Sequence, residues 1–421
     1  ALGVTGDVDI YYSTDGGATY PNLIATVPAS DGTYAWTVPA DESARCRIFI
    51  EDATATYSDE SNADFTIGHT FAIASTTGEE GAISAAFDGT NFLVGLQGDI
   101  VAGYNVGAQF IDQNGSLVGD HISTGRTGGI PLVASNGTNH LMVWIDDAAA
   151  DDYAYGQLID SSGTPVAPAF PIENSARVND IRGVAFGTTE YLVVYERTVV
   201  TDWIMFGRMV DTNGNVGSEF QISTLPVDEG KNNVAFDGMN FLVVWVDSPG
   251  GTEVRGRFVN AAGEPQGAAE FVIDASAFPS DNPCSVGFNG TNYLVVWHDE
   301  VAPGEWDVFG RLVTPGGGFA SGVIPIMTDA GMQLSLGVVS DGSGFLLTYT
   351  DISDPDDWDV HAQFIDFDGL LVGSAFPIDT SPGNQIGVTA AFGDSAYLVL
   401  VNDGVASDFS SFGDVHGVLI S

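Results

Sequence analysis

The chain has 421 residues, and its 44% hydrophobic and 11% aromatic content is enough for a large buried core, which excludes global disorder. Its 56 acidic against 11 basic residues give a formal net charge of −45, which excludes nucleic acid as a partner because phosphate binding needs clustered Lys and Arg. No apolar run reaches the ~18 residues of a membrane helix, and the two cysteines, Cys46 and Cys284, lie too far apart to indicate a disulfide framework.

Residues 1–68 consist of short alternating runs separated by Gly, Asp and Pro, which predicts an antiparallel β-sandwich. The stretches "YYSTDGGATY", "YAWTVP" and "CRIFIED" make the segment from Gly6 to Ile67 similar to the immunoglobulin-like or fibronectin-like modules of large bacterial surface and secreted proteins. That resemblance implies two further strands before Val8, where this chain has only "ALGVTGD". We therefore expect either that the chain begins inside the module or that a partner supplies the missing strands by β-augmentation, a route that would also allow self-assembly.

From residue 69 onward one phrase recurs seven times, as in "VAFDGMNFLVVW" from Val234 and "VGFNGTNYLVVW" from Val286, at spacings of 48 to 52 residues. A period near fifty made of short strands predicts a β-propeller and not a helical solenoid. Each copy has two apolar runs joined by a turn such as Asp237-Gly238, then a third run, then in most copies a short Phe-x-Ile run. Each copy is therefore predicted to be one four-stranded blade.

The seventh copy has no fourth run, because its third run ends the sequence at Ser421. A spare Phe-x-Ile lies before the first copy, in "FAIAS" from Phe71. We therefore predict that this strand completes the last blade, which leaves no open sheet edge. The predicted fold is all-β, with a partial sandwich over residues 1–68 and a seven-bladed β-propeller over residues 69–421, and the whole resembles propellers of bacterial secreted or surface type.

The longer loops are predicted to share one face of the ring, where a rigid scaffold usually carries its ligand sites. One of them, "DISDPDDWD", offers five carboxylates, and such oxygen ligands suit Ca²⁺. The loop does not fit the EF-hand pattern, so a solvated acidic loop is the alternative. Calcium is the one cofactor that the sequence indicates, with these candidate ligands: Asp351, Asp354, Asp356, Asp357 and Asp359.

Three tryptophans, Trp203, Trp306 and Trp358, occupy the same repeat position just before the third run, and His298 lies toward the same face. Exposed Trp side chains stack on sugar rings or fill protein hot spots, so these four residues are the candidates for binding a glycan or a protein. The alternative is that each Trp caps its own blade. The polar position that Arg257 occupies on the third run recurs as Arg or Gln and is predicted to be architectural.

Propeller enzymes provide a second hypothesis. The stretch "STDGGATY" from Ser13 resembles the Asp-box of sialidase-type propellers, but it occurs once and outside the repeats. The resemblance implies an Arg cluster for the substrate carboxylate. Arg126, Arg177 and Arg182 lie in connections between the fourth run of one copy and the first run of the next, but no nucleophile and acid pair can be named beside them. A polysaccharide lyase would need a base, for which His298 with Asp299 is the only loop pair to offer.

We predict no catalytic residue. The favoured function is a non-enzymatic extracellular or cell-surface protein whose propeller is a binding or assembly platform for a glycan, a protein or a neighbouring subunit. The alternative is a carbohydrate-active enzyme, either a sialidase-like hydrolase or a polysaccharide lyase, with its site on the long-loop face.

Overall fold

The computed structural model describes residues 6–34, 36, 43–52, 54, 56–61, 65–67, 69–74, 80–101, 104–147, 152–174, 178–247, 253–267, 269–275, 284–302, 304–328, 331–354, 357–405 and 413–420. The regular structure of these residues is β-strand, apart from one short 3-10 helix, η1 (Ala29–Asp31). Within these ranges no helix is long and apolar enough to cross a membrane. The strands form eight sheets, one of five strands and seven of four strands, so the all-β class is confirmed.

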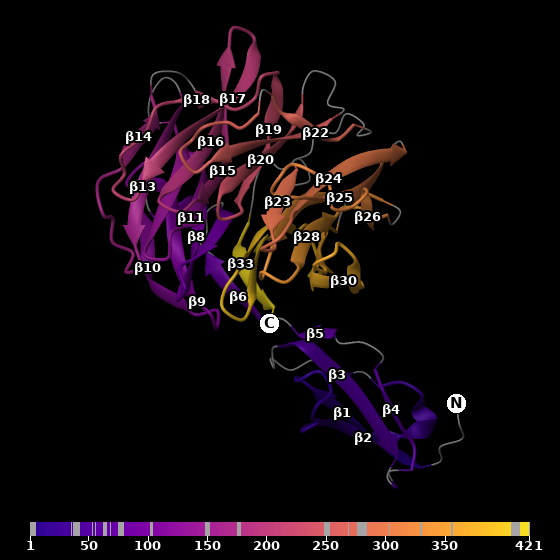
Figure 1. Ribbon diagram of the computed structural model, residues 1–421. Coiled ribbons are helices and arrows are strands. Elements are labelled where there is room, and N and C mark those ends of the chain that lie inside the picture. The colour runs from indigo at the N-terminus through magenta and orange to yellow at the C-terminus, as the bar shows by residue number, and fades with distance from the viewer. Residues whose placement is uncertain are drawn as a thin grey trace.

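The five-stranded sheet contains the N-terminal strands in the order β2-β1-β3-β4, with β5 paired to β3. Its strands are β1 (Asp7–Ser13), β2 (Asn22–Pro28), β3 (Ser43–Asp52), β4 (Ser58–Glu60) and β5 (Phe65–Ile67). Figure 1 shows these strands apart from the other sheets, with β5 nearest to them. The described residues form a single layer here, so the second sheet of the predicted sandwich is not among them.

The stretch that resembles an Asp-box is a hairpin turn between β1 and β2. The hydroxyls of Ser13 and Thr19 and the backbone N–H of Thr19 donate to the Asp15 carboxylate. These hydrogen bonds stabilise the charged form and lower the pKa of Asp15 to about 2. The turn explains these residues without any role in a reaction.

The seven four-stranded sheets are antiparallel and follow one another along the chain. The first three are β7 (Glu80–Phe87), β8 (Asn91–Val101), β9 (Tyr104–Asp112) and β10 (Leu117–Ser123); β11 (Gly129–Ser135), β12 (Asn139–Asp146), β13 (Tyr153–Asp160) and β14 (Phe170–Glu173); and β15 (Asp180–Phe186), β16 (Glu190–Val199), β17 (Asp202–Asp211) and β18 (Phe220–Gln221). The next two are β19 (Val227–Phe236), β20 (Asn240–Asp247), β21 (Val254–Asn260) and β22 (Phe271–Asp274); and β23 (Ser285–Phe288), β24 (Tyr293–Ala302), β25 (Glu305–Val313) and β26 (Ile324–Met327). The last two are β27 (Gln333–Val339), β28 (Phe345–Asp351), β29 (Asp359–Ile365) and β30 (Leu371–Asp379); and β31 (Ile386–Phe392), β32 (Tyr397–Asn402), β33 (Val415–Ile420) and β6 (His69–Ala74).

These sheets close into a ring. The first strand of each sheet contacts the first strand of the next, in the order β7, β11, β15, β19, β23, β27 and β31, and β31 contacts β7 again. The outer strand of the last sheet is β6, which pairs with β33 so that Phe71 lies opposite Gly417. The prediction that the N-terminal Phe-x-Ile strand completes the last sheet is therefore confirmed, and the arrangement is that of a β-propeller.

The second strand of each sheet carries a continuous apolar run because both of its faces are buried. On β20, Val243 and Trp245 pack in a cluster with residues of β16 and β17, whereas Leu242 and Val244 pack in a cluster with residues of β24. The run "FLVVW" thus joins two neighbouring interfaces, which is why it does not alternate with polar residues.

The Phe-x-Ile motif and the glycine turn after the third strand fit each other across neighbouring sheets. Gly214 has a φ of 85°, and a Cβ there would lie 2.9 Å from Cε1 of Phe170 in the preceding sheet. Gly115 in the first sheet stands in the same way over Phe71 of the last sheet, at 2.6 Å. One recurring contact therefore orders the turn, packs the outer strand and closes the ring.

Candidate functional site

The residue that follows the apolar run of each second strand carries a side chain that faces the next sheet. This repeat position is occupied by Gln97, Ile145, Glu196, Val246, His298, Thr350 and Asn402. Four of the polar members bond to the first strand of the following sheet, with these donor–acceptor distances: Ile130 N–H to Gln97 Oε1 at 2.9 Å, Asn232 Nδ2 to Glu196 Oε1 at 2.6 Å, Gly387 N–H to Thr350 Oγ1 at 3.1 Å, and Ala82 N–H to Asn402 Oδ1 at 2.9 Å. The position therefore connects neighbouring sheets.

His298 occupies this position at the contact between the fifth and sixth sheets. Its side chain is only 2% exposed, on the same face of β24 as Leu294 and Val296, and neither ring nitrogen has a hydrogen-bond partner among the described residues. Burial lowers the pKa of His298 to about 3, so the ring is neutral at physiological pH. The structure places this predicted ligand-binding residue inside the packing between two sheets, where no ligand on the loop face can reach it.

The three predicted tryptophans are held by the ring to different degrees. Trp358 is 4% exposed and packs with Ile386 and Val405, so its face is not available for stacking on a sugar. Trp203 is half-buried against the cluster between the third and fourth sheets. Trp306 is half-buried as well, and its backbone N–H donates to the Gly331 carbonyl at 3.0 Å. Capping of the sheets explains Trp358 best, and a ligand role for Trp203 and Trp306 stays a prediction.

The acidic loop before β29 is organised by its own hydrogen bonds. The Asp351 carboxylate accepts the hydroxyl of Ser353, and the Asp357 carboxylate accepts the N–H of Gly383 at 2.8 Å. Desolvation raises the pKa of Asp359, and the charges of Asp357 and Asp351 act in the same direction.

Calcium binding at this loop stays a prediction. Asp354 contributes its backbone carbonyl to the turn, and Asp356 lies outside the described residues. Within the ranges given above, no group of three or more His, Cys, Asp or Glu side chains is arranged to hold a metal ion.

Every arginine side chain that the structure describes is already engaged by the protein itself. The carboxylate partners are Glu60 for Arg47, Asp146 for Arg126, Asp180 for Arg182, Glu219 for Arg197, Glu173 for Arg208, and Asp247 with Glu253 for Arg255. Arg257 and Arg311 donate to backbone carbonyls of the preceding sheet, those of Ile222 and Ile273. Arg197 and Arg208 meet through Glu219 and Tyr195, but both are already held there by the protein's own carboxylates.

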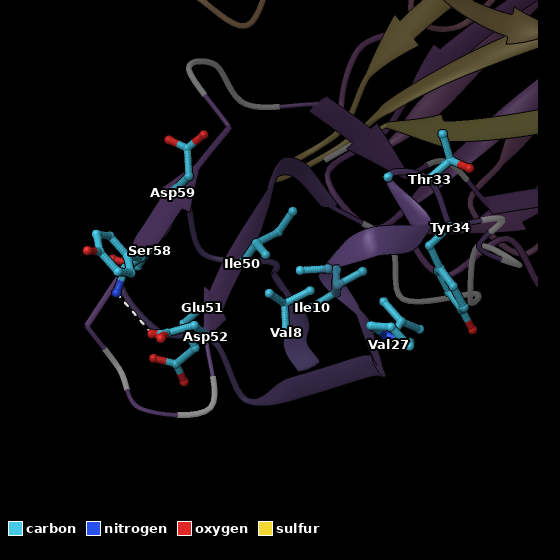
Figure 2. Close-up of a pocket in the computed structure, with 14 residues that line it drawn as sticks. Val8, Ile10, Val27, Thr33, Tyr34, Ile50, Glu51, Asp52, Ser58 and Asp59 are labelled. Atoms are coloured by element: carbon cyan, nitrogen blue, oxygen red, sulfur yellow. Dashed lines mark hydrogen bonds between the residues drawn. The ribbon is translucent and has the colours of Figure 1, made fainter. Parts of the chain in front are cut away.

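The N-terminal sheet bears an open groove that the sequence patterns did not single out. Its floor consists of Val8 and Ile10 of β1, Val27 of β2 and Ile50 of β3, and its volume is about 660 Å³. Figure 2 shows three of the floor residues, Val8, Ile10 and Ile50, side by side, with Tyr34 on one flank and the acidic side chains Asp52 and Asp59 on the other. The same face continues into a small core in which Trp36 packs on Tyr12, with ring centroids 5.2 Å apart.

The signal for this groove was present in the sequence. Alternation along "VDIYY" and "RIFIED" puts Val8, Ile10 and Tyr12, and likewise Ile48 and Ile50, on one face of the sheet. Alternation could not show how much of this face is covered. Among the described residues, only the end near Tyr12 and Trp36 is packed, and the end near Val8 and Ile50 is open.

No protein-family model and no curated protein matches this chain. Among solved structures it is similar to a subtype N10 neuraminidase-like protein of A/little yellow-shouldered bat/Guatemala/060/2010, with 10% identity over 70% of this chain and 95% of that chain and a TM-score of 0.44. It is also similar to AofleA from Arthrobotrys oligospora, with 10% identity over 76% of this chain and 92% of that chain and a TM-score of 0.46. A subtype N11 neuraminidase-like protein of A/flat-faced bat/Peru/033/2010 gives 9% identity over 70% and 88% and a TM-score of 0.42. The fold assignment rests on the strand pairing and not on these likenesses.

Proposed function

We propose that this chain is a non-enzymatic extracellular or cell-surface interaction protein. In this proposal residues 69–421 are a seven-bladed propeller that acts as a rigid platform, and residues 1–68 are a separate module that attaches it to a partner. The observation that carries the proposal is the open apolar groove over Val8, Ile10 and Ile50. A soluble sheet with one uncovered apolar face lowers its free energy when another surface covers that face.

The polar groups of the ring favour binding over catalysis. A sialidase-like site would need free arginines, whereas the described arginines hold the protein's own carboxylates and carbonyls. A lyase-like base at His298 would need access to substrate and a pKa near the working pH, whereas this ring is enclosed with a pKa of about 3. These observations count against the carbohydrate-active alternative.

The loop face is proposed as a second, weaker contact surface for a glycan or protein, with Trp203 and Trp306 as its aromatic contacts. Calcium is proposed to bridge the acidic loop at Asp351, Asp357 and neighbouring carboxylates, because a chain of −45 net charge gains from bound cations. If so, chelation lowers the melting temperature of the native chain and leaves an Asp351→Asn, Asp357→Asn variant unchanged.

The test uses the full chain and a panel of soluble and insoluble polysaccharides, with calcium and with chelator. Retention and released sugar are recorded together. The proposal expects no released sugar under either condition, with or without retention. Release of reducing sugar would overturn it in favour of an enzyme, provided that a heat-denatured sample releases none.

A further inference from the structure

We propose that the groove on the N-terminal sheet binds an extended segment of another polypeptide, one that presents apolar side chains to the sheet and carries Lys or Arg at its flanks. This inference rests on the proposed interaction function and names the partner's chemistry.

The apolar requirement follows from the half-covered face. At one end of the sheet Tyr12 and Cys46 are buried beneath Trp36, with Ile24 and Ile48 packed beside them. At the other end the same face is open, and Ile50 is 38% exposed while Tyr34 and Tyr57 at the margins are 47% and 52% exposed. A strand laid about 10 Å above the sheet would continue the layer that Trp36 begins and cover these residues.

An extended backbone suits the shape of the site. The floor residues come from three neighbouring strands, with Val8 opposite both Val27 and Asp52 in the strand register. The open surface is therefore a strip across β2, β1 and β3, not an enclosed pocket. Side chains at every second position of a strand could contact such a strip.

The charge requirement follows from the margin of the groove. The lining residues include Asp52 and Asp59, which alternation places on the same face as Ile50, and no Lys or Arg. Asp52 is held in its charged form because the Thr54 hydroxyl and the N–H groups of Tyr57 and Thr56 donate to it, which lowers its pKa. An anionic margin attracts basic flanks and repels acidic ones.

The same charges argue against a second copy of this chain as the occupant. A second copy would bring to the margin at Asp52 and Asp59 a groove that offers no Lys or Arg of its own. Each copy also carries a net charge of −45. Basic flanks on a different polypeptide avoid both costs.

The probe is a synthetic strand peptide that alternates Val and Thr and has two Lys at each end, and the control has two Glu at each end. Both carry a fluorophore, and binding to the full chain is measured by fluorescence anisotropy at low and at high salt. We expect the Lys peptide to bind at least tenfold more tightly than the Glu peptide, with the difference reduced by salt.

Variants locate the binding. Tyr34→Ser with Tyr57→Ser removes exposed lining residues without touching the buried core, and it should weaken the Lys peptide about tenfold. Asp59→Asn should weaken the Lys peptide while leaving the Glu peptide unchanged or tighter. The matched control is Val118→Ser, a 38% exposed apolar residue of β10 in the ring, which should change neither affinity.

Three outcomes would overturn the inference: equal affinity for the two peptides, no measurable binding of either, or affinities that the groove variants leave unchanged. Sedimentation velocity adds a fourth, because self-association that Tyr57→Ser abolishes would identify a second copy as the occupant. Failure of this inference is distinguishable from failure of the proposed function, since only released sugar from the polysaccharide panel would show the chain to be an enzyme.

Discussion

Replacing His298 with Val or Asn is expected to remove a stability loss that the native chain suffers between pH 7 and pH 5. Both residues already stand at the same repeat position in other sheets, as Val246 and Asn402, so the site accepts their size and shape. Asn402 even bonds to both the N–H and the C=O of Ala82 across its interface.

The magnitude follows from the burial of the His298 ring. Its pKa falls from 6.5 in the unfolded chain to about 3 in the folded one. The unfolded chain therefore binds the additional proton, so the stabilising contribution is complete above pH 6.5 and is lost as the pH falls toward 3. At pH 5 the unfolded ring is almost fully protonated and the folded ring is neutral, which costs about 2 kcal/mol relative to pH 7. For a chain of this length that amounts to roughly 2–3 °C in melting temperature.

Urea unfolding and calorimetry at pH 7 and pH 5 would measure this loss for the native chain and both variants. His140 titrates in all three proteins, and its pKa is also lowered by burial against the opposing effect of Asp88, so its contribution cancels. The native chain should lose about 2 kcal/mol more than either variant. If all three lose the same amount, His298 is not held neutral by burial and the reasoning fails.

Three further predictions concern the packing and charge of the ring. Gly214→Ala and Gly238→Ala both place a Cβ at positive φ, and each should lower the free energy of unfolding by about 1 kcal/mol. Gly214→Ala should lower it by a further ~1–3 kcal/mol because its Cβ would meet Phe170, whereas no described atom lies within 4 Å of a Cβ at Gly238. Urea unfolding compares the two variants, and equal losses of stability would mean that the Phe–glycine contact does not constrain the ring. Arg257→Gln should lower the free energy of unfolding by about 1.5–3 kcal/mol in the same assay, because Arg257 Nη1 donates to the Ile222 carbonyl of the preceding sheet at 2.6 Å. Gln157, at the equivalent position, bonds within its own repeat to the Ala167 carbonyl. An unchanged urea midpoint would contradict the idea that Arg257 holds two sheets together. Raising the salt concentration from about 20 to about 500 mM should raise the melting temperature, because screening reduces repulsion at a net charge of −45, and a melt insensitive to salt would refute that explanation.

The sequence predicts the ring well because the recurring residues form the contacts between neighbouring sheets as well as the strands themselves. The Phe-x-Ile run before the first copy could be assigned to the last sheet only by counting strands, and the pairing of Phe71 with Gly417 confirms that count. The alternating Arg and Gln on the third strand were predicted to be architectural, and Arg257 and Arg311 indeed bond to carbonyls of the preceding sheet.

The candidate site was harder to predict because loop position does not determine exposure. His298 and Trp358 both lie near long loops, yet both are buried, since each packs in the contact between its own sheet and the next. The groove over Val8 and Ile50 escaped prediction for the opposite reason. Alternation predicts which residues share a face, but it does not reveal whether another layer covers that face.

The two parts of the chain differ in how completely they cover the apolar faces and open edges of their own strands. In the ring, each sheet buries its apolar residues against two neighbours, and β6 removes the last open edge. In the N-terminal sheet, β2 is an edge strand and the face around Ile10 has no covering layer among the described residues. Covering the open face around Ile10 with another apolar surface is therefore expected to lower the free energy of the N-terminal sheet. A partner recognised by apolar contact is expected at the groove, and partners recognised by charge or cations are expected at the loops of the ring.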